Sequence, residues 1–176
     1  MTMFSNERYE TLKLFLDQIA LAVFGVVTAV ASSRSPAFRI IFGVIGIGLY
    51  FYIIYATMWE IGAKDRIRVD AGREEKKPAK PLVMGLIANI PNFILGLAGL
   101  LVLLNNGTAQ TFGSAAISVS KLLQGYYLGL SNLAGLSENP FTWLVTALAA
   151  VGITVTGYTV GYRGVPFLIF KNKKQQ

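Results

Sequence analysis

Residues 60–81 read EIGAKDRIRVDAGREEKKPAKP and hold seven of the sixteen Lys and Arg residues of this 176-residue chain. They also hold five of its nine acidic residues. A long apolar stretch lies on each side, at residues 37–59 and at residues 82–104. Because about 20 apolar residues cross the ~30 Å hydrocarbon core of a bilayer as a helix, this pattern predicts two membrane spans joined by a charged loop.

The rest of the chain is equally apolar. Hydrophobic residues make up 53% of it and charged residues only 14%, whereas a soluble domain carries about a quarter charged residues. Two further apolar stretches occupy residues 14–32 and 141–162. We therefore predict an all-α, polytopic integral membrane protein, in which one membrane domain (residues 1–176) contains a bundle of four transmembrane helices.

The positive charges predict how this bundle is oriented. With four spans, both chain ends and the loop at residues 60–81 share one side, which then holds thirteen of the sixteen Lys and Arg residues, including the basic tail at residues 171–176. Only Arg34, Arg39 and Lys121 fall on the other side. Such an excess marks the cytoplasmic side. We expect a plasma-membrane protein with both termini in the cytoplasm.

The outer loop, residues 105–140, contains apolar residues at helical spacing, namely Val119, Leu122, Leu123, Tyr126, Tyr127, Leu130 and Leu133. This spacing predicts an amphipathic helix that either lies in the outer interface or dips back as a re-entrant piece. The alternative is a fifth span at residues 113–136. A fifth span would move the basic tail to the side opposite the N-terminus, so the charge bias favours four spans.

The residue types that are missing narrow the functions available. The chain has no Cys and no His, so it lacks thiolate ligands, the commonest metal ligand and the commonest general base. Neither a GK[ST] phosphate loop nor a Gly-x-Ser-x-Gly motif occurs. We expect no catalytic, cofactor-binding or metal-binding residues, no cofactor, and no enzymatic activity.

The net charge of +7 would suggest nucleic acid as a partner for a soluble protein. Here the aromatic residues lie in the spans and not beside the basic residues, so we expect no nucleic-acid binding. The basic residues are expected to contact anionic lipid headgroups.

Four residues within the spans could line a polar path. Asp17 lies near the start of the first span, where it either pairs with Lys13 at the interface or binds a proton or cation inside the membrane. Asn89, Pro91 and Asn92 lie in the third span. Pro91 has no N–H and so predicts a kink, and the two Asn side chains could satisfy freed backbone groups or line a substrate path.

Gly157 and Gly161 form a GxxxG pair in the fourth span. Such pairs let two helices approach closely in a membrane. They are candidates for helix packing, within one chain or between copies of it.

These features favour a small accessory or scaffold subunit of a membrane complex, which presents residues 60–81 to a membrane or cytoplasmic protein partner. The alternative is a protomer of an oligomeric small-solute or ion transporter or channel, since four short spans leave little room for a pathway within one chain. Transport usually requires several inward-facing ionisable groups. The spans contain few, which favours the accessory subunit.

Overall fold

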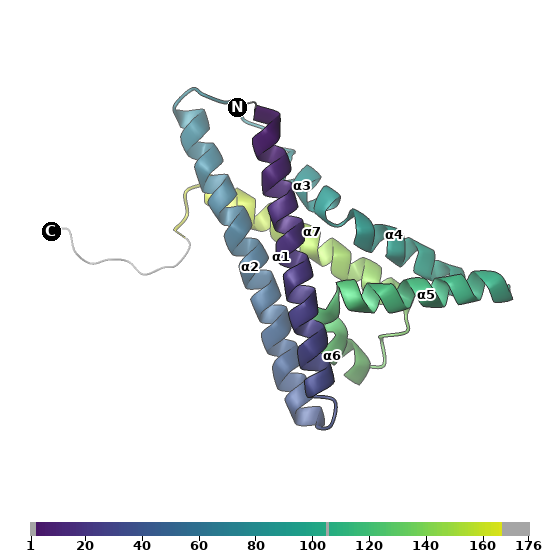
Figure 1. Ribbon diagram of the computed structural model, residues 1–176. Coiled ribbons are helices and arrows are strands. Elements are labelled where there is room, and N and C mark those ends of the chain that lie inside the picture. The colour runs from purple at the N-terminus through teal and green to yellow at the C-terminus, as the bar shows by residue number, and fades with distance from the viewer. Residues whose placement is uncertain (1–2, 105, 167–176) are drawn as a thin grey trace.

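The computed structural model describes residues 3–104 and 106–166, and the side chains of α1 from Tyr9 onward. The basic tail at residues 171–176 lies outside the described residues. The fold is all-α, as predicted (Figure 1). In chain order its elements are α1 (Met3–Ala31), α2 (Pro36–Asp70), α3 (Lys80–Ala88), α4 (Ile90–Gly99), the 3₁₀ turn η1 (Leu100–Leu103), α5 (Gly107–Leu123), α6 (Gly125–Leu133) and α7 (Pro140–Tyr162).

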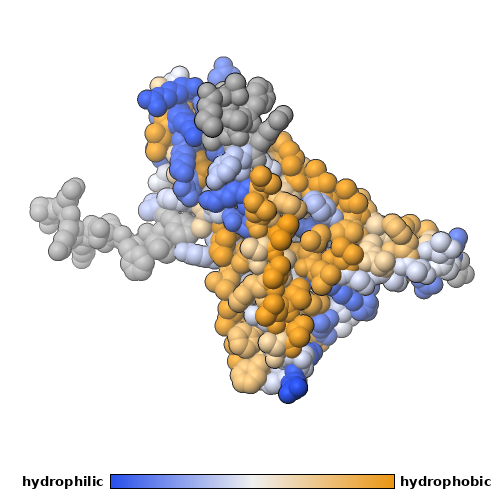
Figure 2. All heavy atoms as spheres, in the orientation of Figure 1, coloured by the Kyte–Doolittle hydropathy of each residue, from blue (hydrophilic) through white to orange (hydrophobic). Residues whose placement is uncertain are grey.

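Three of these helices, α1, α2 and α7, are long and apolar enough to cross a membrane. A fourth candidate span is the pair Lys80–Ala88 and Ile90–Leu103, which is bent by 55° at Asn89. Figure 2 shows a broad hydrophobic surface over the bundle, with hydrophilic residues gathered at its upper end. The chain is a polytopic helical membrane protein.

The long helix α2 corrects one boundary expected from the sequence. Residues 60–70 continue α2 for about three turns and do not belong to a loop, so the connection to α3 is residues 71–79. The charges of this part alternate in sequence, but on a helix they separate by face. Lys64 bonds Glu60 at 2.6 Å on the exposed face, while Asp65 is buried.

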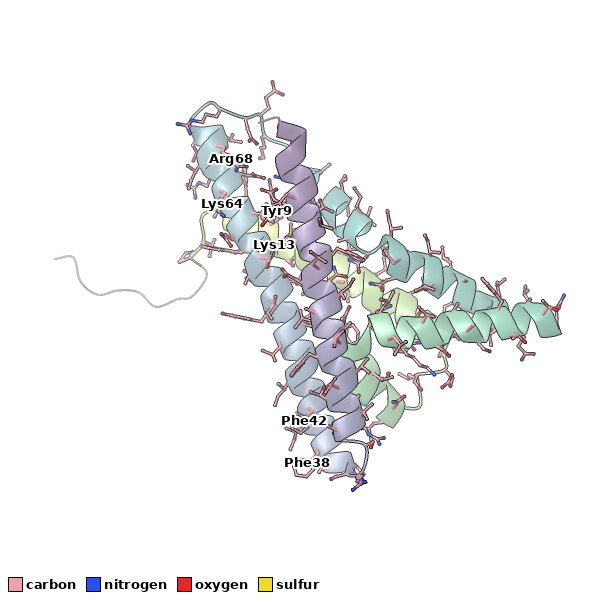
Figure 3. The ribbon with its side chains drawn as sticks, viewed as in Figure 1. Tyr9, Lys13, Phe38, Phe42, Lys64 and Arg68 are labelled. Atoms are coloured by element: carbon pink, nitrogen blue, oxygen red, sulfur yellow. The ribbon has the colours of Figure 1, made fainter. Side chains whose placement is uncertain are left out.

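The bundle has two ends, which we name by what they contain. The charged end holds the last turns of α2 and the first residues of α3, and the turn end holds residues 32–35, which join α1 to α2. In Figure 3, Arg68 lies near the charged end, and Phe38 and Phe42 lie near the turn end. Helices α2 and α7 make the most extensive contact of the fold and run in the same direction, toward the charged end.

Helices α5 and α6 fill the space between α4 and the α1–α2 hairpin on the turn-end side (Figure 1). Gly113 lies against Val102 and Ile117 against Gly99, so α5 runs antiparallel to α4, back toward the α1–α2 hairpin (Figure 1). Leu130 packs on Gly43, and α6 runs antiparallel to α2, back toward the turn end.

The change of direction occurs at Gln124, between α5 and α6. The next residue, Gly125, touches the backbone of Ala22 and Val26, which lie within the candidate span Tyr9–Ala31 of α1. Beside a fifth span, the sequence analysis considered an interfacial and a re-entrant arrangement for this loop, and of these two the contacts favour the re-entrant one. We call α5 and α6 the re-entrant pair.

Candidate functional site

Charged side chains from three helices meet in the interior of the charged end. The ammonium of Lys80 on α3 lies 2.7 Å from Asp65 Oδ2 on α2 and 3.0 Å from Glu10 Oε2 on α1. The three side chains are only 7%, 6% and 10% exposed. Together with Arg68 and Tyr158 they form what we call the ion cluster.

Arg68 and Tyr158 complete this cluster. The Tyr158 hydroxyl on α7 donates to Asp65 Oδ2 at 2.9 Å. Arg68 Nη1 lies 3.3 Å from Asp65 Oδ1 and 4.0 Å from Glu10 Oε1, and it also reaches Glu74 in the connecting segment at 3.7 Å. The two buried carboxylates are therefore balanced by two cations.

The ion cluster holds helix ends together through ion pairs and hydrogen bonds between them. A buried charge is tolerated when it is paired and hydrogen-bonded, and removal of one partner leaves the other uncompensated. The Asp65 carboxylate accepts hydrogen bonds from Lys80 of α3 and Tyr158 of α7. It also pairs with Arg68 of its own helix, α2. The cluster thereby joins the ends of α1, α2, α3 and α7.

Asp17 lies on α1 away from this cluster. It lines a cleft of about 330 Å³ with Phe24 of α1 and Leu49 and Ile53 of α2, among others. Its carboxylate accepts a hydrogen bond from the Thr57 hydroxyl at 3.3 Å. Lys13, the partner suggested by sequence, is instead close enough to attract the carboxylate of Glu60.

Asn89 and Asn92 are hydrogen-bonded to each other at the bend between α3 and α4. Asn89 is fully buried, and its amide nitrogen donates to the Gly85 carbonyl at 2.9 Å. The Asn92 amide donates to Asn89 Oδ1 at 3.0 Å. The bend occurs at Asn89, so Pro91 falls in the first turn of α4, where its missing N–H costs nothing.

Asn89 and Asn92 are joined by a hydrogen bond, but Asp17 is bonded to Thr57 instead. Within residues 3–104 and 106–166, no hydrogen bond joins Asp17 to Asn89 or Asn92. Pro91 lines a different cavity, between α1 and α3.

Gly157 and Gly161 lie where α7 crosses α2. A Cβ on Gly157 would press on the Tyr55 carbonyl, and one on Gly161 would overlap the backbone of Trp59. The GxxxG pair therefore faces the interior of the bundle.

The break in the re-entrant pair is a polar site that the sequence analysis missed. Gln124 is fully buried; its amide nitrogen donates to the Trp143 carbonyl at 3.1 Å, and its oxygen accepts from the Thr146 hydroxyl. Its sequence signal is weak: a Gln-Gly step within an apolar helical pattern.

Further polar side chains have buried atoms without a hydrogen-bond partner among the described residues. They include Gln18, which is 3% exposed, and the hydroxyls of Tyr50 and Tyr127. Tyr127 packs edge-on against Tyr50, and Tyr50 stacks on Tyr126 at 3.7 Å between ring centroids. The interior between α1, α2 and α6 is thus aromatic with a few unsatisfied polar atoms.

No protein family, curated protein or solved structure matches this chain.

Proposed function

We propose that this protein is an accessory or scaffold subunit of a membrane complex. One support is that its buried ionisable groups are paired within the chain. The buried charges of the ion cluster pair with one another, and Asp17 accepts a hydrogen bond from Thr57. Groups that serve transport face a shared aqueous interior, whereas self-neutralised groups stabilise a framework.

The observation that carries the proposal is an open face of small residues on α7. Ala149, Gly152 and Thr156 are exposed on this helix, and a Cβ on Gly152 would meet nothing within 4 Å. Since lipid tails are as apolar as Leu, helices associate in membranes through small residues that permit close packing. The face lies beside exposed Leu148 and Val145 and is available to a partner helix.

A second contact surface is proposed at the charged end. Lys64, Arg66 and Asp70 are exposed on α2, and in the connecting segment 71–79 every residue except Glu74 is exposed. Asp65, Arg68 and Lys80 are engaged in the ion cluster, so they are not part of this surface. It would receive a cytoplasmic or membrane protein partner.

The proposal includes an orientation and a compartment. The charged end would face the cytoplasm and the turn end the outside of the plasma membrane, with both termini cytoplasmic. The support is the charge bias, because Arg34, Arg39 and Lys121 are the few cations assigned to the turn end.

The test is purification of the tagged full chain from its native membrane in a mild detergent. A stoichiometric membrane partner is expected. Gly152→Leu should remove most of it, because the added side chain fills the open face. Gly48→Leu is the matched control, since a Cβ on Gly48 also meets nothing within 4 Å but lies on α2. A wild-type chain that purifies alone, or equal recovery with both variants, contradicts the proposal.

The surface at the charged end needs a separate variant. Lys64→Gln combined with Arg66→Gln and Arg73→Gln removes exposed charge and leaves the ion cluster intact. Loss of the partner in this variant, with unchanged thermal stability, supports a contact there. Full retention of the partner removes this surface from the proposal.

The second candidate is a protomer of an oligomeric transporter or channel. It is favoured by two helix breaks with buried amides, at Asn89 and Gln124, and by the unsatisfied atoms of Gln18. Broken helices line many substrate and ion sites. In proteoliposomes, Gln124→Leu should then abolish an ion or solute flux that the wild type supports, and absence of any wild-type flux counts against this candidate.

A further inference from the structure

A cavity near the charged end is a groove between α1 and α3. It has a volume of about 830 Å³ and is bounded by α1, residues 77–79, α3 and the first residues of α4. Its walls are mainly apolar and include Phe15, Val83, Met84 and Ile87. Several residues on its rim are half-exposed, Val83 and Ile87 at 49% each, so the groove opens on the outer surface of the bundle.

The bend at Asn89 separates the helices on either side of this groove. α3 packs against α1, whereas α4 packs against α5 and α7 and diverges from α1 (Figure 1). Ala88, Ile90 and Pro91, which flank the bend, line the deep end of the groove. An apolar volume therefore remains at the depth of the candidate spans.

The other end of the groove is basic. Lys77 and Lys80 line it there, beside Pro78 and Thr11. Lys80 pairs with Asp65 and Glu10 in the ion cluster, and Lys77 lies on the exposed connecting segment. The groove thus runs from an end lined by two lysines, at the charged end of the bundle, to an apolar end near the bend at Asn89.

The size of the groove limits what can occupy it. A helix about 10 Å wide would fill 830 Å³ in roughly 10 Å of its length, or about two turns, which is too short for a transmembrane contact. The same volume lies within the range of about 300–1,000 Å³ that is usual for small-molecule sites. An acyl chain with a charged head has the length and polarity that the groove offers.

We propose that this groove binds one anionic phospholipid. An acyl chain lies between Phe15 of α1 and Val83 and Ile87 of α3, and the phosphate lies at Lys77. Basic residues at the charged end attract anionic headgroups, which are abundant in the cytoplasmic leaflet. This inference does not depend on the proposed accessory role.

The test uses the full chain, delipidated in detergent and titrated with phosphatidylglycerol or phosphatidylcholine, with bound lipid counted by native mass spectrometry. One phosphatidylglycerol is expected to bind in preference to phosphatidylcholine. Val83→Trp fills the groove and should abolish this binding. Val44→Trp is the matched control, because Val44 is an exposed valine on α2 outside the groove.

Lys77→Gln is a second test that does not depend on whether Val83→Trp folds. Lys77 lies on an exposed segment, so this substitution should not disturb the fold. It should weaken phosphatidylglycerol binding roughly fivefold and leave phosphatidylcholine binding unchanged. Equal binding of the two lipids, no effect of Lys77→Gln, or unchanged binding to a folded Val83→Trp chain overturns the proposal. A dimer that forms in place of lipid binding and is lost in Val83→Trp also overturns it, since the occupant is then a second copy.

Discussion

The ammonium of Lys80 and the carboxylate of Asp65 lie 2.7 Å apart inside the bundle, although they come from different helices and both side chains are less than 10% exposed. Lys80 also pairs with Glu10. We predict that Lys80→Met destabilises the protein by about 3–5 kcal/mol, because two buried carboxylates lose the more buried of their two cations. Unfolding of the purified protein in detergent measures the change.

Lys64→Met is the control for this prediction. Lys64 pairs with Glu60 at 2.6 Å, but both side chains are more than half exposed, and such pairs contribute about 0–1 kcal/mol. If the two variants unfold at the same denaturant concentration, the ion cluster does not clamp the helices.

The α2–α7 crossing offers a comparison between two glycines of one helix. Gly161→Ala places a Cβ on the backbone of Trp59, whereas Gly152→Ala places it in open space. We expect Gly161→Ala to destabilise the protein by about 1–3 kcal/mol through overpacking. Gly152→Ala should be neutral or slightly stabilising, by up to about 1 kcal/mol. Thermal unfolding in the same detergent compares them, and a harmless Gly161→Ala would show that the helices do not pack this closely.

The bend between α3 and α4 depends on a short chain of hydrogen bonds. Asn89 bonds both Gly85 and Asn92, whereas Asn92 bonds Asn89. Asn89→Leu should therefore cost more than Asn92→Leu, each within about 1–3 kcal/mol for a lost buried hydrogen bond. The double variant should cost less than the sum of the two, because they share one bond. Additive losses in equilibrium unfolding would mean that the two side chains act independently.

The sequence was informative where the physical signal is local. Apolar length predicted the spans, and Pro91 predicted the bend that lies at Asn89. The ion cluster was not predicted, because Glu10, Asp65, Lys80 and Tyr158 are far apart in the chain and only the packing of four helices brings them together.

The end of α2 was misjudged for a related reason. Mixed charges at residues 60–70 resemble a solvated loop, but the buried positions Ile61, Gly62 and Asp65 follow the helical repeat of Met58. Gln124 gave almost no signal, since one amide in an apolar pattern is as easily exposed as buried. Its burial follows from the packing of the break against α7, where Trp143 and Thr146 bond the amide, and no pattern in the sequence predicts this packing.

The re-entrant pair should enter and leave the membrane on the turn-end side. The chain has no Cys, so single cysteines can be placed at exposed Gly107, Ala134 and Ala71 and labelled with an impermeant maleimide in sealed vesicles of known orientation. We predict that Gly107→Cys and Ala134→Cys react from the same side, and Ala71→Cys from the opposite side. Labelling of Ala134→Cys from the side of Ala71→Cys would make residues 113–136 a complete span and would contradict the account.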